Sequence, residues 1–449
     1  MNAYVERVID EVKKKYKDQK EFVQTVEEVF SSVSPVLDRH PEYEKAGILE
    51  RMVEPERMFT FRVVWTDDEG KPHTNVGYRC QFNGAIGPYK GGLRFQKNVN
   101  ESIMKFLAFE QTYKNALTGL PIGGGKGGSD FDPAGKSEAE IMRFCQSYMT
   151  ALYRYIGPDQ DVPAGDMGVG GREIGYLFGQ YRRLRGDYKN GVLTGKGLSY
   201  GGSLIHPEAT GYGAIYYLNE VLKDQGDSLA GKRIGVSGFG NVAWGIMKKS
   251  AELGARVTYM SGPDGYIHDE EGIITPEKID FVVGMRRDDP MHCRPYAERF
   301  GCEFVEGRKF WGVKDVDIYM PAAIQNDVLL EDAKRIADSG VKYYIEVANM
   351  PTANDALELL RKSPVIVAPS KAVNAGGVGV SGLEMSQNSQ RLSWSEEEVD
   401  ELLKLMMKNI YRDSKRAAQE YGLGYDLIGG ANIAGFEKVA RAMYEQGIF

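Results

Sequence analysis

The chain has 449 residues, with 56 Lys and Arg against 63 Asp and Glu, so its formal net charge is −7. This acidic balance argues against a nucleic-acid or anionic-membrane surface. No apolar run reaches the ~18 residues that a membrane span needs, and the four cysteines lack paired metal-ligand spacing. We expect a cytoplasmic protein of two or three domains, with no metal, membrane or nucleic-acid partner.

The first 195 residues predict an α/β domain. Residues 3–33 have the apolar spacing of two amphipathic helices, which we expect Pro35 and Pro41 to end. Aromatic and β-branched runs at 58–65 and 73–82 predict a hairpin. A helix over 100–117, a glycine-rich strand and a second helix capped by Ser137 and Glu140 are expected to follow.

The second half alternates short apolar strands with helices. A Gly- and Ser-rich stretch at 191–210 is the expected linker. Beyond it, strands are predicted at 232–237, 256–260, 317–320, 343–348 and 365–368. This alternation is typical of a doubly wound parallel sheet. A long helix capped by Ser395 and a last helix over 436–444 end the chain, and we expect the last one to pack back on the N-terminal half.

Glycine is unusually abundant, at 54 of 449 residues, or about 12% against a typical ~7%. One glycine cluster follows the predicted strand 232–237 and opens a predicted helix. It has the dinucleotide-binding spacing GxGxxA, in which the helix N-terminus holds a diphosphate. The residues of this candidate coenzyme loop are Gly238, Phe239, Gly240, Asn241, Val242 and Ala243.

The next strand predicts which coenzyme is used. In this fold the strand normally ends in an acid that binds the adenosine ribose, whereas here the acid, Asp264 after Pro263, is displaced beyond the strand end. No Lys or Arg lies between Arg256 and Lys278 to pair with a 2′-phosphate. We therefore favour NAD, with NADP as the alternative.

Lysines within glycine clusters are the candidate chemical groups. Lys126 is flanked by five glycines, but the segment lacks the first glycine and the hydroxyl residue of a P-loop. A desolvated lysine shifts toward its neutral form and can exchange protons. Asp166, in another glycine-rich turn, is a candidate proton-transfer carboxylate, and Lys90 and Lys114 are candidate anion-binding groups.

Together these motifs resemble the hexameric glutamate dehydrogenases of the glutamate/leucine/phenylalanine/valine dehydrogenase superfamily. The resemblance spans essentially the whole chain. It rests on YRCQFNGAIGPYKGGLRF (78–95), FEQTYK (109–114), LPIGGGKGGSDFDP (120–133), DVPAGDMGVGGR (161–172), PEATGYG (207–213), GFGNVA (238–243) and SKAVNAGGVGVSG (370–382).

The resemblance implies an α/β fold with two domains and the cleft between them. Residues 1–200 would bind substrate and form the oligomer, with the helix at 425–449 packing back, and residues 201–424 would form a Rossmann-type coenzyme domain. It further implies reversible oxidative deamination of glutamate to 2-oxoglutarate and ammonia with NAD or NADP, by a homo-oligomer of six subunits.

The resemblance also assigns roles residue by residue. Lys126 would polarise the carbonyl or activate water, and Asp166 would move protons to and from the amino group. Lys90 with Ser381 would bind the side-chain carboxylate, and Lys114 the α-carboxylate. The other implied substrate contacts are Gly91, Gly92, Ala164 and Val378, and the other implied coenzyme contacts are Thr210, Ala322, Asn349 and Asn374. His206 departs from the pattern, because arginine is expected there.

Three other readings stay open at this point. A sister dehydrogenase for an apolar amino acid should lack the cation at Lys90 and the hydroxyl at Ser381. A non-catalytic nucleotide-binding homologue should lose Lys126 or Asp166. A pyridoxal-phosphate enzyme would use Lys371, although the coenzyme loop argues against it.

Overall fold

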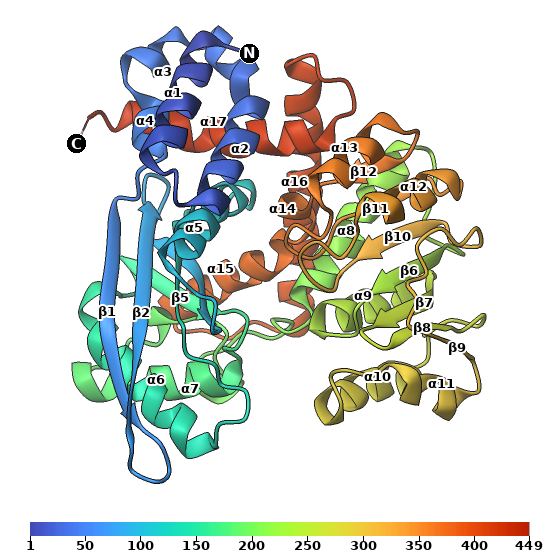
Figure 1. Ribbon diagram of the computed structural model, residues 1–449, viewed down its shortest axis with the longest axis horizontal. Helices are drawn as coiled ribbons and strands as arrows, with labels where there is room; N and C mark the ends of the chain where they lie inside the picture. Colours follow the sequence, from blue (N-terminus) through green and yellow to red (C-terminus); the bar gives the residue numbers. More distant parts are fainter. Residues whose placement is uncertain (449) are drawn as a thin grey trace.

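The computed structural model describes residues 1–448, which form two α/β lobes (Figure 1). Four helices begin the chain: α1 (Ala3–Lys15), α2 (Lys20–Arg39), α3 (Pro41–Lys45) and α4 (Ile48–Met52). The prediction that Pro35 ends the second helix is wrong, because Pro35 lies inside α2. The next two residues, Val36 and Leu37, are buried, and this burial offsets the backbone hydrogen bond that proline cannot donate.

The first lobe is built on a five-stranded sheet in the order β1-β2-β4-β3-β5. Its strands are β1 (Arg57–Thr66), β2 (Pro72–Asn83), β3 (Tyr89–Phe95), β4 (Gly123–Ser129) and β5 (Asp161–Gly165). The first two form the predicted antiparallel hairpin. Strand β3 runs parallel to both β4 and β5, so these three strands end at the same edge of the sheet.

Helices pack around this sheet at positions that the sequence indicates. They are α5 (Glu101–Leu117), α6 (Glu138–Leu152) and α7 (Gly171–Arg185), with short 3-10 turns η1 (Tyr153–Tyr155), η2 (Asn190–Val192) and η3 (Leu198–Tyr200). The predicted capping box of Ser137 and Glu140 is confirmed at the start of α6. Asn100 caps α5 by accepting from the Ile103 amide.

The second lobe contains a seven-stranded sheet in the order β12-β11-β10-β6-β7-β8-β9. Its strands are β6 (Arg233–Ser237), β7 (Arg256–Gly262), β8 (Gly265–His268), β9 (Glu303–Glu306), β10 (Ile318–Pro321), β11 (Tyr343–Ile345) and β12 (Ile366–Ala368). The five strands from β12 to β7 are parallel, which confirms the Rossmann-type fold. Strands β8 and β9, which the sequence did not predict, add an antiparallel edge.

The parallel strands are connected by helices, as a doubly wound fold requires. The helices of this lobe are, in chain order, α8 (Ala209–Asp224), which precedes β6, then α9 (Asn241–Glu252), α10 (Pro276–Asp288), α11 (Arg294–Phe300), α12 (Leu330–Asp338) and α13 (Asn354–Lys362), and α14 (Ser370–Val373), which follows β12. No helix among residues 1–448 is long and apolar enough to cross a membrane.

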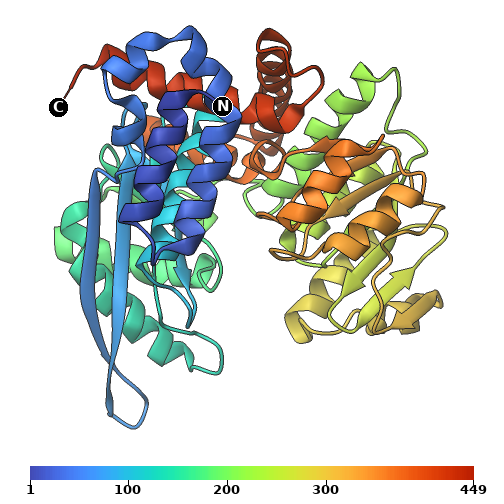
Figure 2. The same ribbon diagram turned by 45° about the horizontal axis from the view of Figure 1, so that its top comes forward.

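Three C-terminal helices join the two lobes: α15 (Ala375–Gln390), α16 (Glu396–Glu420) and α17 (Leu427–Glu445). Helix α15 lies between the lobes and contacts both α5 and α8 (Figures 1 and 2). Helix α17 returns to the first lobe, where Phe436 and Val439 share a buried core with α1, α2 and α5. Residue 449, the last of the expected C-terminal segment, lies outside the described residues.

Candidate active site

A buried charge cluster is formed by side chains in β4, near the end of β3 and directly after β5. Lys126 on β4 places its Nζ 3.0 Å from Oδ2 of Asp166, which directly follows β5. The Arg94 Nε donates to the same oxygen at 2.8 Å. The sequence singled out Lys126 and Asp166 separately as candidate proton-transfer groups, and the structure brings them together. The sequence did not predict Arg94, although this residue stands four positions after Lys90 in a quoted motif.

The cluster changes the proton affinity of both candidate catalytic groups. Burial lowers the pKa of Lys126, and the Asp166 carboxylate only partly opposes that effect. Burial alone would raise the pKa of Asp166, but Lys126 and Arg94 together hold it well below its usual range. Asp166 is therefore a carboxylate at neutral pH, next to a lysine that releases its proton more easily than a surface lysine.

Lys114 on α5 is a second cation next to this cluster. Burial and the charge of Lys126 lower the pKa of Lys114 to about 8. Among residues 1–448, no carboxylate forms an ion pair with Lys114, whereas its helical neighbour Glu110 faces Lys371 at 3.8 Å. The four-residue spacing of Glu110 and Lys114 on α5 would allow an ion pair, but that pair does not form. Lys114 is therefore available to bind an anion.

The glycines of β3 are required by close backbone packing. A Cβ on Gly91 would lie 1.6 Å from the Gly125 carbonyl oxygen, and one on Gly92 would lie 2.9 Å from the Asp166 Cβ. Ala164 pairs with Gly92 across β3 and β5. Glycine is a poor strand former, so these positions are explained by the approach of neighbouring strands and of Asp166.

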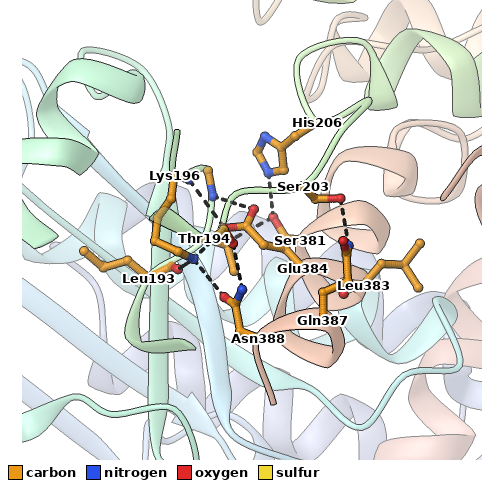
Figure 3. A network of polar contacts seen from close by, with 12 residues as sticks. Leu193, Thr194, Lys196, Ser203, His206, Ser381, Leu383, Glu384, Gln387 and Asn388 are labelled. Carbon is orange, nitrogen blue, oxygen red and sulfur yellow. Dashed lines mark hydrogen bonds and ion pairs between the residues drawn. The ribbon is translucent and has the colours of Figure 1, made fainter. Parts of the chain in front are cut away.

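Lys90 begins a second polar group, separate from the charge cluster. Its Nζ donates to Thr194 Oγ1 at 2.7 Å, and Thr194 Oγ1 donates to Ser381 Oγ at 3.3 Å. His206 Nε2 lies 3.1 Å from the same serine oxygen (Figure 3). We call Lys90, Thr194, Ser381 and His206 the distal pocket. It joins Lys90 to Ser381 through Thr194, which the sequence analysis did not single out.

Burial gives the distal pocket an unusual lysine. Desolvation, together with the nearby Arg79, lowers the pKa of Lys90 to about 7. Arg79 is itself buried and bonds Asp161 through its Nε at 2.9 Å, beneath β3. Burial also lowers the pKa of His206, so this histidine favours its neutral form. A bound anion would restore the charge on Lys90, because an opposite charge favours the protonated form.

The candidate coenzyme loop has the geometry that its sequence predicts. Gly238 has φ of +82°, in the left-handed region that favours glycine, and Gly240 is the N-terminal cap of α9. Asn241 and Val242 form its first turn, so free backbone amides face outward where a diphosphate binds in this fold. Phe239 is buried, with its ring against Gly262.

Asp264 has a structural partner that the sequence did not reveal. Its carboxylate accepts from the backbone amides of Cys293 and Arg294, at 2.9 and 3.1 Å, at the start of α11. A cation also approaches the coenzyme loop, since Arg286 on α10 donates to Asn241 Oδ1 at 2.5 Å. Arg286 lies on α10, outside the stretch between Arg256 and Lys278 that follows the coenzyme loop in sequence, so its position in the sequence does not reveal this contact.

The remaining coenzyme candidates lie on α8, after the ends of β10 and β11, and at the start of α15. Asn374 Nδ2 donates to Asn349 Oδ1 at 2.9 Å, while its own buried Oδ1 has no partner among residues 1–448. Thr210 faces Gly377 on α15, next to Val378. The Ala322 amide donates to Ser237 at 3.0 Å. The unpaired amide oxygen of Asn374 is a site that a carboxamide donor would satisfy, and the nicotinamide ring carries such a group.

Comparison with known proteins agrees with this geometry. Residues 201–447 match the family described as Glutamate/Leucine/Phenylalanine/Valine dehydrogenase, and residues 55–183 match the Glu/Leu/Phe/Val dehydrogenase, dimerisation domain. The NAD-specific glutamate dehydrogenase of Clostridium symbiosum is 64% identical over 449 residues, covering 100% of both chains. The NADP-specific glutamate dehydrogenase of Haemophilus influenzae is 52% identical, covering 96% of both.

Solved structures give the same answer. A glutamate dehydrogenase structure aligns with a TM-score of 0.98 at 64% identity, covering 99% of both chains. A Plasmodium falciparum glutamate dehydrogenase aligns with a TM-score of 0.96 at 46% identity, covering 99% of this chain and 95% of that one. The chain therefore belongs to the glutamate/leucine/phenylalanine/valine dehydrogenase family.

Proposed function

We propose that this chain is a glutamate dehydrogenase, which interconverts L-glutamate with 2-oxoglutarate and ammonia by hydride transfer to or from NAD. The observation that carries the proposal is the pair of separated cation sites. Lys90 in the distal pocket supplies one positive charge, and Lys114 beside the charge cluster supplies the other. A dicarboxylate substrate needs both, whereas an apolar amino acid would leave Lys90 buried without an anion.

The charge cluster supplies the proton transfers. In the direction of deamination, Asp166 accepts a proton from the substrate ammonium, since its carboxylate is held ionised by Lys126 and Arg94. Lys126, whose pKa is lowered by burial, takes a proton from the water that attacks the iminium carbon. Asp166 then returns its proton to the amino group, which leaves as ammonia while the C=O bond forms, and protonated Lys126 polarises the new carbonyl. Lys114 holds the α-carboxylate so that the α-carbon stays next to both groups.

The coenzyme domain is proposed to bind NAD in preference to NADP. When bound, the coenzyme would supply the hydride acceptor for deamination or the hydride donor for the reverse reaction. The loop from Gly238 to Val242 would hold its diphosphate, Pro263 and Asp264 would lie at the adenosine ribose, and Thr210, Ala322, Asn349 and Asn374 would lie near the nicotinamide. Relatives named as NAD-specific, NAD(P)-specific and NADP-specific all resemble this chain, so NADP remains the alternative.

We further propose that six copies assemble, with residues 1–200 and the returning C-terminal helix forming the substrate and oligomerisation part and 201–424 the coenzyme part. The family description of residues 55–183 as a dimerisation domain supports an oligomer. A hexamer has six times the mass of one chain by light scattering, and a monomer would contradict the proposal. The cytoplasmic location stays a prediction.

The test of the proposed activity is reductive amination followed as NADH oxidation. Purified protein is given ammonia with 2-oxoglutarate or with 2-oxohexanoate, an apolar 2-oxo acid, and each assay is repeated with NADPH. We expect turnover with 2-oxoglutarate and NADH to be the most efficient by kcat/KM. Preference for 2-oxohexanoate would identify a sister dehydrogenase, and no turnover with either acid would identify a non-catalytic homologue.

A further inference from the structure

A buried carboxylate lies directly behind the distal pocket. Glu384 is on α15, one helical turn beyond Ser381, and it is fully buried. Its Oε2 accepts from the Gly195 amide at 3.0 Å, and its Oε1 accepts from the Lys196 amide at 3.4 Å and from Lys196 Nζ at 2.6 Å (Figure 3). Three donors from one loop therefore converge on this one side chain.

The loop held by Glu384 is the one that carries Thr194. On its other side, the Thr194 amide donates to the Pro163 carbonyl oxygen of β5 at 3.1 Å. Lys196 Nζ also donates to Asn388 Oδ1 at 2.9 Å, and Asn388 donates to the Gly201 carbonyl oxygen at 2.7 Å. The segment from Thr194 to Gly201 is thus tied both to the sheet of the first lobe and to α15.

We propose that Glu384 is a positioning residue, which fixes Thr194 between Lys90 and Ser381 and so determines the selectivity for a substrate with a distal carboxylate. This inference rests on the proposed function, because it assigns the distal pocket to that carboxylate. Glu384 forms no hydrogen bond or ion pair with the four described residues of the distal pocket. It acts through the backbone amides of the two residues that follow Thr194.

The hydrogen-bond geometry explains why Thr194 needs such support. Its Oγ1 lies 2.7 Å from Lys90 and 3.3 Å from Ser381, so a displacement of about 1 Å would break at least one of the two hydrogen bonds. If Glu384 lost its oxygens, the buried Lys196 amide and the partly buried Gly195 amide would lack their acceptor. Unpaired buried amides are costly, and the loop would move to pair them elsewhere.

The electrostatics favour the same role. The negative charge of Glu384 opposes the effect of burial on Lys90 and on His206. Its charge is balanced by Lys196, and both side chains are shielded from solvent. Because their charges cancel, the Glu384–Lys196 ion pair holds the loop without adding net charge beside the distal pocket, which must bind an anion.

The experiment compares two double variants that remove the same ion pair. Deleting only one charge would leave the other buried and unpaired, which is strongly destabilising. Lys196→Met with Glu384→Gln keeps an acceptor for the loop amides, and the Gln amide can donate to Asn388. Lys196→Met with Glu384→Leu removes that acceptor. The measured quantities are kcat and KM for 2-oxoglutarate and 2-oxohexanoate, the KM for NADH and the thermal midpoint.

We expect the Leu double variant to have a KM for 2-oxoglutarate at least tenfold above that of the Gln double variant, with the KM for NADH and the efficiency with 2-oxohexanoate unchanged. A purely structural role would lower the thermal midpoint and all activities together. Equal KM values in the two double variants would overturn the inference. As a matched control, Lys278→Met with Asp269→Asn removes a largely buried pair of the second lobe, joined at 2.7 Å, and should leave the KM for 2-oxoglutarate unchanged.

Two more variants separate the possible failures. Thr194→Val removes the hydroxyl without touching Glu384, and should raise the KM for 2-oxoglutarate as much as the Leu double variant does. If the KM does not rise, the Thr194 hydroxyl does not contribute to substrate binding, and the inference that Glu384 positions it is wrong. This result holds even if the Leu double variant fails to fold. Lys90→Leu tests the pocket itself. Unchanged selectivity in Lys90→Leu would instead contradict the proposed function.

Discussion

At the scale of single residues, the site is explained by which charges share the buried edge of the first sheet. Lys126 and Asp166 were predicted from their glycine-rich surroundings, and the structure brings them to 3.0 Å. Arg94 could not be predicted, because nothing in its spacing distinguishes it from a solvated arginine. Because the Arg94 guanidinium also pairs with Asp166, this carboxylate contacts two cations. Proton transfer at the site therefore depends on Arg94 as well as on Lys126 and Asp166.

Replacing Arg94 by Met should move the pH dependence of the reaction. Arg94 lowers the pKa of Lys126 by charge repulsion. Without it, protonated Lys126 becomes more favourable, and its pKa rises. In a plot of kcat/KM for glutamate deamination against pH, the titration of Lys126 should therefore move to higher pH. Arg143→Met, which removes an arginine bonded to Asp68 at 2.7 Å, is the control and should leave the profile in place.

Asp166→Asn should remove proton transfer while keeping the shape of the side chain. General acid–base groups contribute about 10²–10⁴-fold to turnover, so kcat should fall by that factor. The dissociation constant for NADH, measured by fluorescence titration, should stay within about twofold, because Asp166 is on the first lobe. Wild-type turnover in this variant would mean that another group moves the proton.

At the scale of elements, helix starts and apolar strands were the most predictable features. Ser137 and Glu140 fix the start of their helix through local hydrogen bonds. The coenzyme loop is fixed by backbone conformations and close contacts that only glycine allows. Strands β8 and β9 were missed because they carry exposed or half-buried polar residues and so lack the continuous apolar run of the parallel strands. The continuation of α2 beyond Pro35 depends on tertiary burial, and the partnership of Glu384 with residues 195–196 joins segments almost 190 positions apart. Neither leaves a local signal.

Helix α17 shows how a distant element stabilises the N-terminal helices. Phe436 is fully buried in the core that α17 shares with α2 and α5. Phe436→Ala should lower the free energy of unfolding by about 3–5 kcal/mol, since it removes a large side chain and leaves a cavity. Denaturant unfolding measures this loss. Leu405→Ala, at a position 53% exposed on α16, should change it by less than about 0.5 kcal/mol.

At the scale of the whole molecule, the site is divided between two lobes that meet at α15. Lys90, Lys114, Lys126 and Asp166 come from the first lobe, and the coenzyme loop comes from the second. Helix α15 has Asn374 as its N-terminal cap and Ser381 in its middle, so it connects the expected nicotinamide position to the distal pocket. Sequence motifs predicted the candidate residues of both lobes. The contacts of Thr194, His206 and Glu384 near α15 could be found only from the three-dimensional structure.

The central claim is that Lys90 selects a substrate with a distal carboxylate. The most direct test is the ratio of kcat/KM for 2-oxoglutarate to that for 2-oxohexanoate, with NADH and ammonia, in the wild type and in Lys90→Leu. Removing one partner of a buried charge pair costs about 2–5 kcal/mol, so the ratio should fall at least ~30-fold. Lys105→Leu, which replaces another buried lysine that lies over the ring of Tyr16, should keep the wild-type ratio. An unchanged ratio in Lys90→Leu would contradict the account.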